Sequence, residues 1–244
     1  DSRTLRGATA SVGTGTPRPS CCPRPTIRGG WVTPPRGSFV VLEGPDGAGK
    51  STQVARLANR LDALPTREPG DTPLGAELRR LLLDDDQLTR PGLRAEALMM
   101  AADRAQHIEE VVEPALAAGR HVVSDRFIGS SVAYQGYGRG LDPMAVLRIS
   151  QFAAAGLEAD LVIVVDVPVE VTLQRVGGQQ DRIEAAGPEF HRRVRTGFLA
   201  QADADAQRWV VVDGSCAVDE VTDAIVAAVQ DRLGLLNGAS QARG

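Results

Sequence analysis

The feature that most constrains the fold of this chain is a glycine-rich segment that follows a short apolar run. Residues 39–42 (FVVL) are all apolar, and residues 44–51 (GPDGAGKS) fit the pattern G-x-x-x-x-G-K-[ST]. Apolar residues at helical spacing come next, at Val54, Leu57, Leu61 and Leu64. A strand, a glycine-rich turn and a helix N-terminus in this order form a phosphate-binding loop, because converging backbone N–H groups and the helix dipole hold anions. We therefore expect a nucleoside triphosphate to bind here.

Lys50 makes this loop specific, because it is the one lysine of the 244 residues. A compact ammonium can reach between the β- and γ-phosphates, and a planar guanidinium is not equivalent to it. The Ser51 hydroxyl can ligate the Mg²⁺ that accompanies the nucleotide. The loop alone does not choose between a kinase, a GTPase and a motor. We assign nucleotide binding to Gly44, Pro45, Asp46, Gly47, Ala48, Gly49, Lys50, Ser51 and Thr52.

Further strand and helix patterns alternate along the chain. Buried-strand candidates lie at 121–123, 161–165 and 209–212, and helical patterns at 73–83, 93–118 and about 217–233. β-Branched runs that alternate with helices are typical of a parallel sheet covered on both faces. The interval between Leu61 and Thr66 is short, so a vestigial second strand is expected. The fold class predicted is α/β, a P-loop NTPase of three αβα layers, with a five-stranded parallel sheet flanked by helices and a short lid.

Composition divides the chain into a leader, one domain and a tail. Residues 1–37 hold six prolines, six glycines and six arginines against one acid, so we expect a disordered leader. Its origin stays open between a fusion or cloning remnant, an extended reading frame and an organelle transit peptide. The domain is expected at 38–235 and a disordered tail at 236–244. Outside the leader, 21 basic residues face 30 acidic ones, which argues against sequence-independent nucleic-acid binding. Apolar runs are too short to span a membrane, so a cytoplasmic protein is expected.

Five ordered motifs resemble bacterial-type thymidylate kinases, a family of P-loop nucleoside-monophosphate kinases. The resemblance covers about residues 38–233, and the loop above is its first motif. The others are residues 66–70 (TREPG), 101–107 (AADRAQH), 125–136 (DRFIGSSVAYQG) and 181–184 (DRIE) with the following 190–195. The resemblance implies phosphorylation of dTMP to dTDP with ATP and Mg²⁺ in a homodimer.

The same resemblance implies a role for each site residue. Its catalytic residues are Lys50, Arg126, Arg175 and Arg182, the last two from a lid at about 175–187. Its dTMP-binding residues are Asp46 at the sugar 3′-hydroxyl, Arg126 at the phosphate, Arg104, Ser131 and Gln135 at the base, Tyr134 at the deoxyribose, and Arg67 and Met100. Its Mg²⁺ residues are Ser51, Asp125 and Glu184.

Some positions depart from the family pattern. Met100 stands where an aromatic residue usually stacks on thymine, and Asp71 replaces a usual glycine, which would put negative charge near the acceptor phosphate. Ala76 stands where a glutamate is common. Two alternatives therefore stay open: a related deoxynucleoside or nucleotide kinase with another acceptor, and a nucleotide-binding module without transfer activity.

Overall fold

The computed structural model describes residues 35–83, 90–175 and 182–236. The predicted leader, the tail and the middle of the lid fall almost wholly outside these residues, so their assignment stays a prediction. Among the described residues, no helix has the length and apolar character needed to cross a membrane.

The described residues form a five-stranded parallel sheet, as predicted, with the order β2-β3-β1-β4-β5. The second strand is not vestigial, because all four of its residues pair with β3. It begins at Leu64, which the sequence pattern had placed on the first helix; that helix ends at Leu61. The strands are β1 (Phe39–Glu43), β2 (Leu64–Arg67), β3 (Val122–Asp125), β4 (Leu161–Asp166) and β5 (Trp209–Asp213).

Helices connect the strands and cover the sheet. The predicted helical patterns at 73–83, 93–118 and 217–233 correspond to α2, to the run from α3 to α4, and to α9. The α-helices are α1 (Lys50–Leu61), α2 (Pro73–Leu83), α3 (Leu93–His107), α4 (Glu113–Ala117), α5 (Ile128–Ser131), α6 (Pro143–Ala153), α7 (Val169–Arg175), α8 (Pro188–Ala204) and α9 (Val218–Leu233). Two π-helical turns, η1 (Ile108–Val112) and η2 (Val132–Gly138), and the short 3₁₀ turn η3 (Glu184–Ala186) complete the set.

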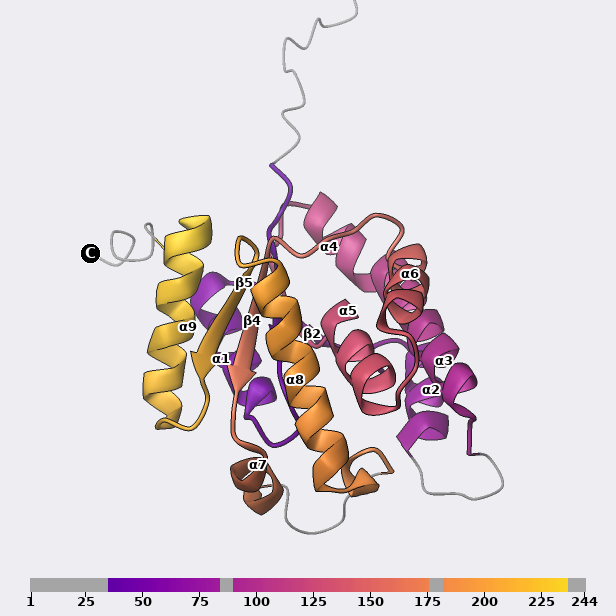
Figure 1. Ribbon diagram of the computed structural model, residues 1–244. Coiled ribbons are helices and arrows are strands. Elements are labelled where there is room, and N and C mark those ends of the chain that lie inside the picture. The colour runs from indigo at the N-terminus through magenta and orange to yellow at the C-terminus, as the bar shows by residue number, and fades with distance from the viewer. Residues whose placement is uncertain (1–34, 84–89, 176–181, 237–244) are drawn as a thin grey trace, which may run out of the picture. The chain divides into compact units, whose positions relative to one another are not determined.

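The alternation of side chains along β1 produces the three layers. Val40 and Leu42 point to one face and pack with apolar residues of α1 and α9. Phe39 and Val41 point to the other face and pack with η1 and α4. Figure 1 shows α8 crossing the sheet beside α5, with α2, α3 and α6 grouped together beyond them. All five residues of β1 are buried, as expected for the central strand of a sheet covered on both sides.

This topology fixes where a ligand can bind. The chain passes from β1 to one side of the sheet for β2 and β3, and to the other side for β4 and β5. Open parallel sheets bind ligands beyond the carboxyl ends of the strands at such a switch point. β1 and β3 lie side by side, with Leu42 opposite Asp125. The glycine-rich loop after β1 and the residues after β3 therefore meet at one edge.

Candidate active site

The loop after β1 has the backbone that its glycines permit. Gly44 has φ +139°, and a Cβ there would lie 2.5 Å from the Val165 carbonyl oxygen. Gly49 has φ +87° and is the N-cap of α1. Both positions therefore require glycine. The loop leads directly into the N-terminus of α1, where backbone N–H groups are available to phosphate oxygens.

Lys50 is buried at the start of α1, and its ammonium donates to the Pro45 carbonyl oxygen at 2.7 Å. Burial, together with repulsion from Arg126, lowers its pKa to about 8, although Asp125, Asp46 and Glu43 act in the opposite direction. The free site therefore holds a cation that gains stability when phosphate oxygens surround it.

This pKa gives a testable pH dependence for nucleotide binding. The protonated ammonium binds phosphate, so affinity for Mg-ATP should stay level below pH 8. Above pH 8 it should fall by up to about tenfold per unit, because an increasing share of free Lys50 must first take up a proton. Calorimetric titration of Mg-ATP between pH 7 and 9.5 measures this, and a constant affinity up to pH 9.5 would contradict the assignment.

Ser51 and Asp125 form a pair suited to Mg²⁺. The Ser51 hydroxyl donates to Asp125 Oδ2 at 2.6 Å, while the buried Oδ1 finds no hydrogen-bond partner in the part of the chain that the structure describes. A hydroxyl and a carboxylate oxygen match the ligands that Mg²⁺ prefers. Among the described residues, no group of three or more His, Cys, Asp and Glu side chains could hold a metal. A Mg²⁺ ion here would therefore take its other ligands from nucleotide phosphates and water.

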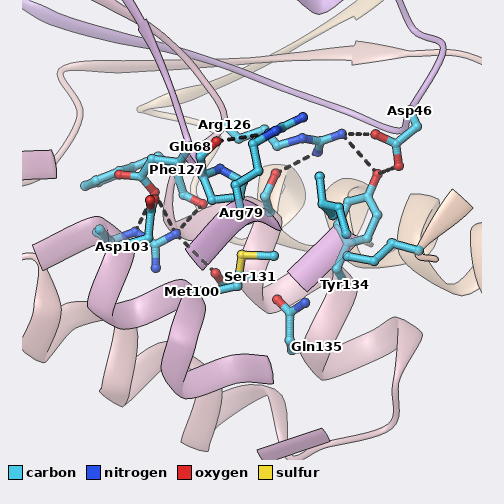
Figure 2. A pocket seen from close by; sticks show the side chains of 15 residues that line it. Asp46, Glu68, Arg79, Met100, Asp103, Arg126, Phe127, Ser131, Tyr134 and Gln135 are labelled. Atoms are coloured by element: carbon cyan, nitrogen blue, oxygen red, sulfur yellow. Dashed lines mark hydrogen bonds and ion pairs between the residues drawn. The ribbon is translucent and has the colours of Figure 1, made fainter. Parts of the chain in front are cut away.

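Arg126 joins the loop to the second half of the site. Its φ of +75° is uncommon for a residue with a side chain. Its guanidinium donates to the Gly44 carbonyl oxygen at 3.1 Å and ion-pairs with Asp46. The Tyr134 hydroxyl donates to the other oxygen of Asp46 at 2.6 Å, and the Tyr134 ring lies under the guanidinium, 4.9 Å from centroid to Cζ. Figure 2 shows these three side chains meeting at one end of a cavity.

Arg104 lies deeper in that cavity and is fully engaged except at one nitrogen. Its Nε donates to Glu68 at 2.9 Å, and its Nη2 donates to the Phe127 carbonyl oxygen at 3.0 Å and to the Ser131 hydroxyl at 3.1 Å. The buried Nη1 has no hydrogen-bond partner among the described residues. Because an unpaired buried donor is costly, this nitrogen is the natural partner for a ligand oxygen.

Two cavities meet at these residues. The first, which we call the acceptor cavity, is lined by most of the residues predicted to bind dTMP, among them Met100, Arg104, Ser131 and Gln135. The second lies over the loop and is lined by Lys50, Ser51, Thr52 and Asp125 among others. Both are lined by Asp46, Glu68, Arg79 and Arg126. Ligands in the two cavities would therefore share a wall that carries two guanidiniums.

Other predicted residues lie outside the acceptor cavity. Arg67 is exposed and lines the cavity over the loop. Arg175 donates to the Gly214 carbonyl oxygen at 3.0 Å, next to β5. Arg182 is buried, donating to the Leu82 carbonyl oxygen and ion-pairing with Glu96 at 2.7 Å. In the described part of the chain, no hydrogen bond joins Arg175 or Arg182 to the loop. The side chain of Glu184 lies outside the described residues.

Asp71 is held away from the position expected for it. Its carboxylate accepts a hydrogen bond from the Thr66 hydroxyl, which also contacts His107 at 2.6 Å. Asp71 lines neither of the two cavities. The expectation that it adds negative charge beside the acceptor phosphate is therefore not supported by this geometry.

Sequence reasoning missed several residues of the site. Glu43 accepts from Ser130 and from the Phe127 N–H, and thereby fixes the turn that carries Arg126; burial raises its pKa to about 7 despite these bonds and the nearby Arg126 charge. Arg79 donates to the Pro69 carbonyl oxygen at 2.9 Å and lines both cavities. Arg79 had a detectable signal, because it is an arginine on the helix that follows the TREPG motif. Glu43 had no comparable signal in the sequence, apart from its position directly before the loop.

A P-loop and a second cavity that shares two arginines with it define a nucleotide phosphotransferase of the P-loop class. A family model described as thymidylate kinase matches residues 42–225. Curated thymidylate kinases from Synechococcus sp. (strain CC9902) and Geotalea uraniireducens (strain Rf4) are 46% and 42% identical, over 208 and 211 residues. Each alignment covers 81% of this chain, with 99% and 98% of the relative. A thymidylate kinase from Neisseria meningitidis (strain FAM18) is 43% identical over 203 residues, 80% of this chain and 98% of the relative. The chain belongs to the thymidylate kinase family.

Proposed function

We propose that this protein transfers the γ-phosphoryl group of ATP to dTMP, with Mg²⁺, and releases dTDP and ADP. The observation that carries the proposal is the wall shared by the two cavities, in which Arg126 and Arg79 face both. Two phosphate groups repel each other, and non-titrating guanidiniums between them offset that repulsion. A module that only bound a nucleotide would need no second cavity of this kind.

The reaction follows from this placement. A phosphate oxygen of dTMP attacks the γ-phosphorus, the bond to the β–γ bridging oxygen breaks, and ADP leaves with that electron pair. Lys50 would stabilise charge on the β- and γ-phosphates, and Arg126 would orient the dTMP phosphate in line. Bound Mg²⁺, held by Ser51 and Asp125, would neutralise charge on the ATP phosphates. Glu184 stays a predicted contributor to that ion.

Four residues favour a deoxynucleotide acceptor with a thymine base. Arg104 Nη1, which has no hydrogen-bond partner among the described residues, would donate to a base carbonyl oxygen. The Tyr134 ring would lie against the deoxyribose, where it would crowd a 2′-hydroxyl. Asp46 would accept from the 3′-hydroxyl in exchange for one of its present bonds. Met100 lines the same cavity, where its thioether can pack on a base face.

The two lid arginines have unequal support for a catalytic role. Arg175, at the end of α7, precedes the segment outside the described residues, and we retain it as the cation that closes on ATP. Arg182 would have to leave a buried ion pair to reach the phosphates, so we propose an anchoring role for it instead.

A panel of acceptors tests the proposed function. ADP release is measured with Mg-ATP and each of dTMP, dUMP, dCMP, TMP with a ribose sugar, and thymidine. We expect dTMP to give the highest kcat/KM. Equal or faster turnover of dCMP or thymidine would support the alternative kinase, and no ADP release with any acceptor would support the non-catalytic module.

We also propose a homodimer, assembled through the outer surface of the helices beyond the acceptor cavity. Several large apolar side chains are exposed there: Leu74 on α2, Leu93 and Leu98 on α3, and Met144 on α6. α3 contacts both α2 and α6, so these residues belong to one group of helices. Sedimentation should give twice the 25.8 kDa of the chain, and Leu98→Glu should shift the mass toward the monomer. A wild-type monomer at micromolar concentration would contradict this. The cytoplasmic location and the absence of a nucleic-acid partner stay predictions from composition.

A further inference from the structure

One buried carboxylate behind the acceptor cavity has no role in the mechanism above. Glu96 lies in the first turn of α3 and is 0% exposed. Its Oε1 accepts from the Gln135 side-chain amide at 3.0 Å and from Arg139 Nε at 3.2 Å. Its Oε2 accepts from Arg182 Nη2 at 2.7 Å. Three segments far apart in the sequence therefore converge on one carboxylate.

Glu96 is ionised in this setting. Burial by itself raises the pKa of Glu96, but the hydrogen bond from Gln135, the charge of Arg139 and the hydrogen bonds from both arginines outweigh it and hold the pKa below its usual range. An ionised carboxylate only accepts hydrogen bonds. It therefore determines which end of a neighbouring side-chain amide can face it.

That determination falls on Gln135, which lines the acceptor cavity and is 1% exposed. Because Glu96 has no proton to give, the NH₂ group of Gln135 must face it, and the carbonyl Oε1 must face away. In the described part of the chain, Oε1 accepts no hydrogen bond. Figure 2 shows Gln135 among the cavity side chains, below Met100 and Ser131.

The polarity of this amide discriminates between pyrimidine bases. A carbonyl oxygen accepts from the N3–H of thymine, whereas N3 of cytosine is itself an acceptor and carries no hydrogen. A site built to pair with a donor rejects an analogue that lacks it, because a buried polar group is then left unpaired. The discrimination between thymine and cytosine would be lost if the Gln135 amide could turn over and present its NH₂ group to the base.

We propose that Glu96 is a positioning residue that fixes the Gln135 amide with its carbonyl oxygen toward the base. It thereby selects a nucleotide whose base carries a hydrogen on N3. This inference rests on the proposed function and names a determinant of its base specificity. Arg139 and Arg182 keep Glu96 charged and in place. Arg182 also ties its part of the lid to α3, and its neighbour Ile183 lines the acceptor cavity, so the same carboxylate helps to set that wall.

The test measures kcat/KM for dTMP and for dCMP in the full-length protein with saturating Mg-ATP. In Glu96→Gln the new amide can donate or accept, so the Gln135 amide is free to turn. We expect the dTMP-to-dCMP ratio to fall by about tenfold, with the dTMP KM raised and the ATP KM unchanged. Arg148→Gln is the matched control, because it removes an arginine charge from the exposed surface of α6 and leaves the hydrogen-bond partners of Glu96 unchanged; its dTMP-to-dCMP ratio should stay at the wild-type value.

Two further variants cover the case in which Glu96→Gln does not fold. Glu96→Asp keeps the charge and withdraws the carboxylate by one methylene, and it should lower the ratio in the same direction. Gln135→Met removes the carbonyl oxygen and should lower the ratio by itself, with no further fall when Glu96 is also changed. A wild-type dTMP-to-dCMP ratio in the folded Glu96 variants, or an equal change of that ratio in Arg148→Gln, would overturn the inference. Failure of the wild-type protein to prefer dTMP would instead overturn the proposed function.

Discussion

Lys50→Ala abolishes phosphoryl transfer, with a loss of at least about a thousandfold in kcat, while the protein stays folded. The ammonium lies against the loop, bonded to the Pro45 carbonyl oxygen, and transfer depends on charge stabilisation at the phosphates. No other lysine exists to replace it. Removal of the ammonium should not destabilise the fold. The buried ammonium is poorly solvated in the free protein, as its pKa of about 8 indicates, so it contributes little to the free energy of unfolding. A coupled ADP-release assay measures the activity, and thermal unfolding measures the stability.

A control on the same helix separates this effect from general damage to α1. Arg56 is partly exposed and ion-pairs with Asp219, a contact of small energetic value. Arg56→Ala should keep wild-type kcat. Lys50→Arg should also be inactive. A planar guanidinium does not fit the space of the compact ammonium that bonds to the Pro45 carbonyl oxygen. If Lys50→Ala kept more than a tenth of the wild-type kcat, the assignment of this loop as the ATP phosphate site would be wrong.

Arg126→Ala should raise the KM for dTMP by about 10- to 150-fold, which corresponds to the loss of one charge-assisted contact of about 1.5–3 kcal/mol. The KM for ATP should change far less, because the loop and Lys50 remain. Asp46 and Tyr134 also lose their cationic partner, so kcat should fall as well. Steady-state kinetics with each substrate varied in turn measures both constants.

Arg120→Ala is the matched control for this change. Arg120 is exposed at the opposite end of β3 from Arg126. Its removal should leave both KM values as in the wild type. An unchanged dTMP KM in Arg126→Ala would count against the placement of the acceptor phosphate.

Local sequence pattern predicted the elements of the site better than it predicted their connections. The glycine-rich loop could be predicted because its function depends on consecutive backbone groups, which a short motif specifies. The parallel sheet followed from apolar runs that alternate with helices. Leu64 was misplaced because apolar spacing alone does not show that α1 ends at Leu61, where Asp62 adopts φ +51°.

Contacts between distant segments were beyond such reasoning. Nothing in the sequence indicates that Glu96 and Arg182, which are 86 positions apart, come within 2.7 Å of each other. An arginine in a lid motif was therefore expected at the phosphates, whereas tertiary packing buries it against α3. The same holds for Asp46, Arg126 and Tyr134, whose triangle exists only because β1 and β3 are neighbours in the sheet.

The central claim is that two phosphate groups are held together across the wall that Arg126 and Arg79 share. Incubation of the protein with Mg-ATP labelled at the γ-phosphorus, together with dTMP, tests it directly when the products are separated. The account predicts that the label appears in dTDP in equal amount to the ADP formed, and that no label moves when dTMP is omitted. Label released only as inorganic phosphate, at a rate that dTMP does not change, would contradict it.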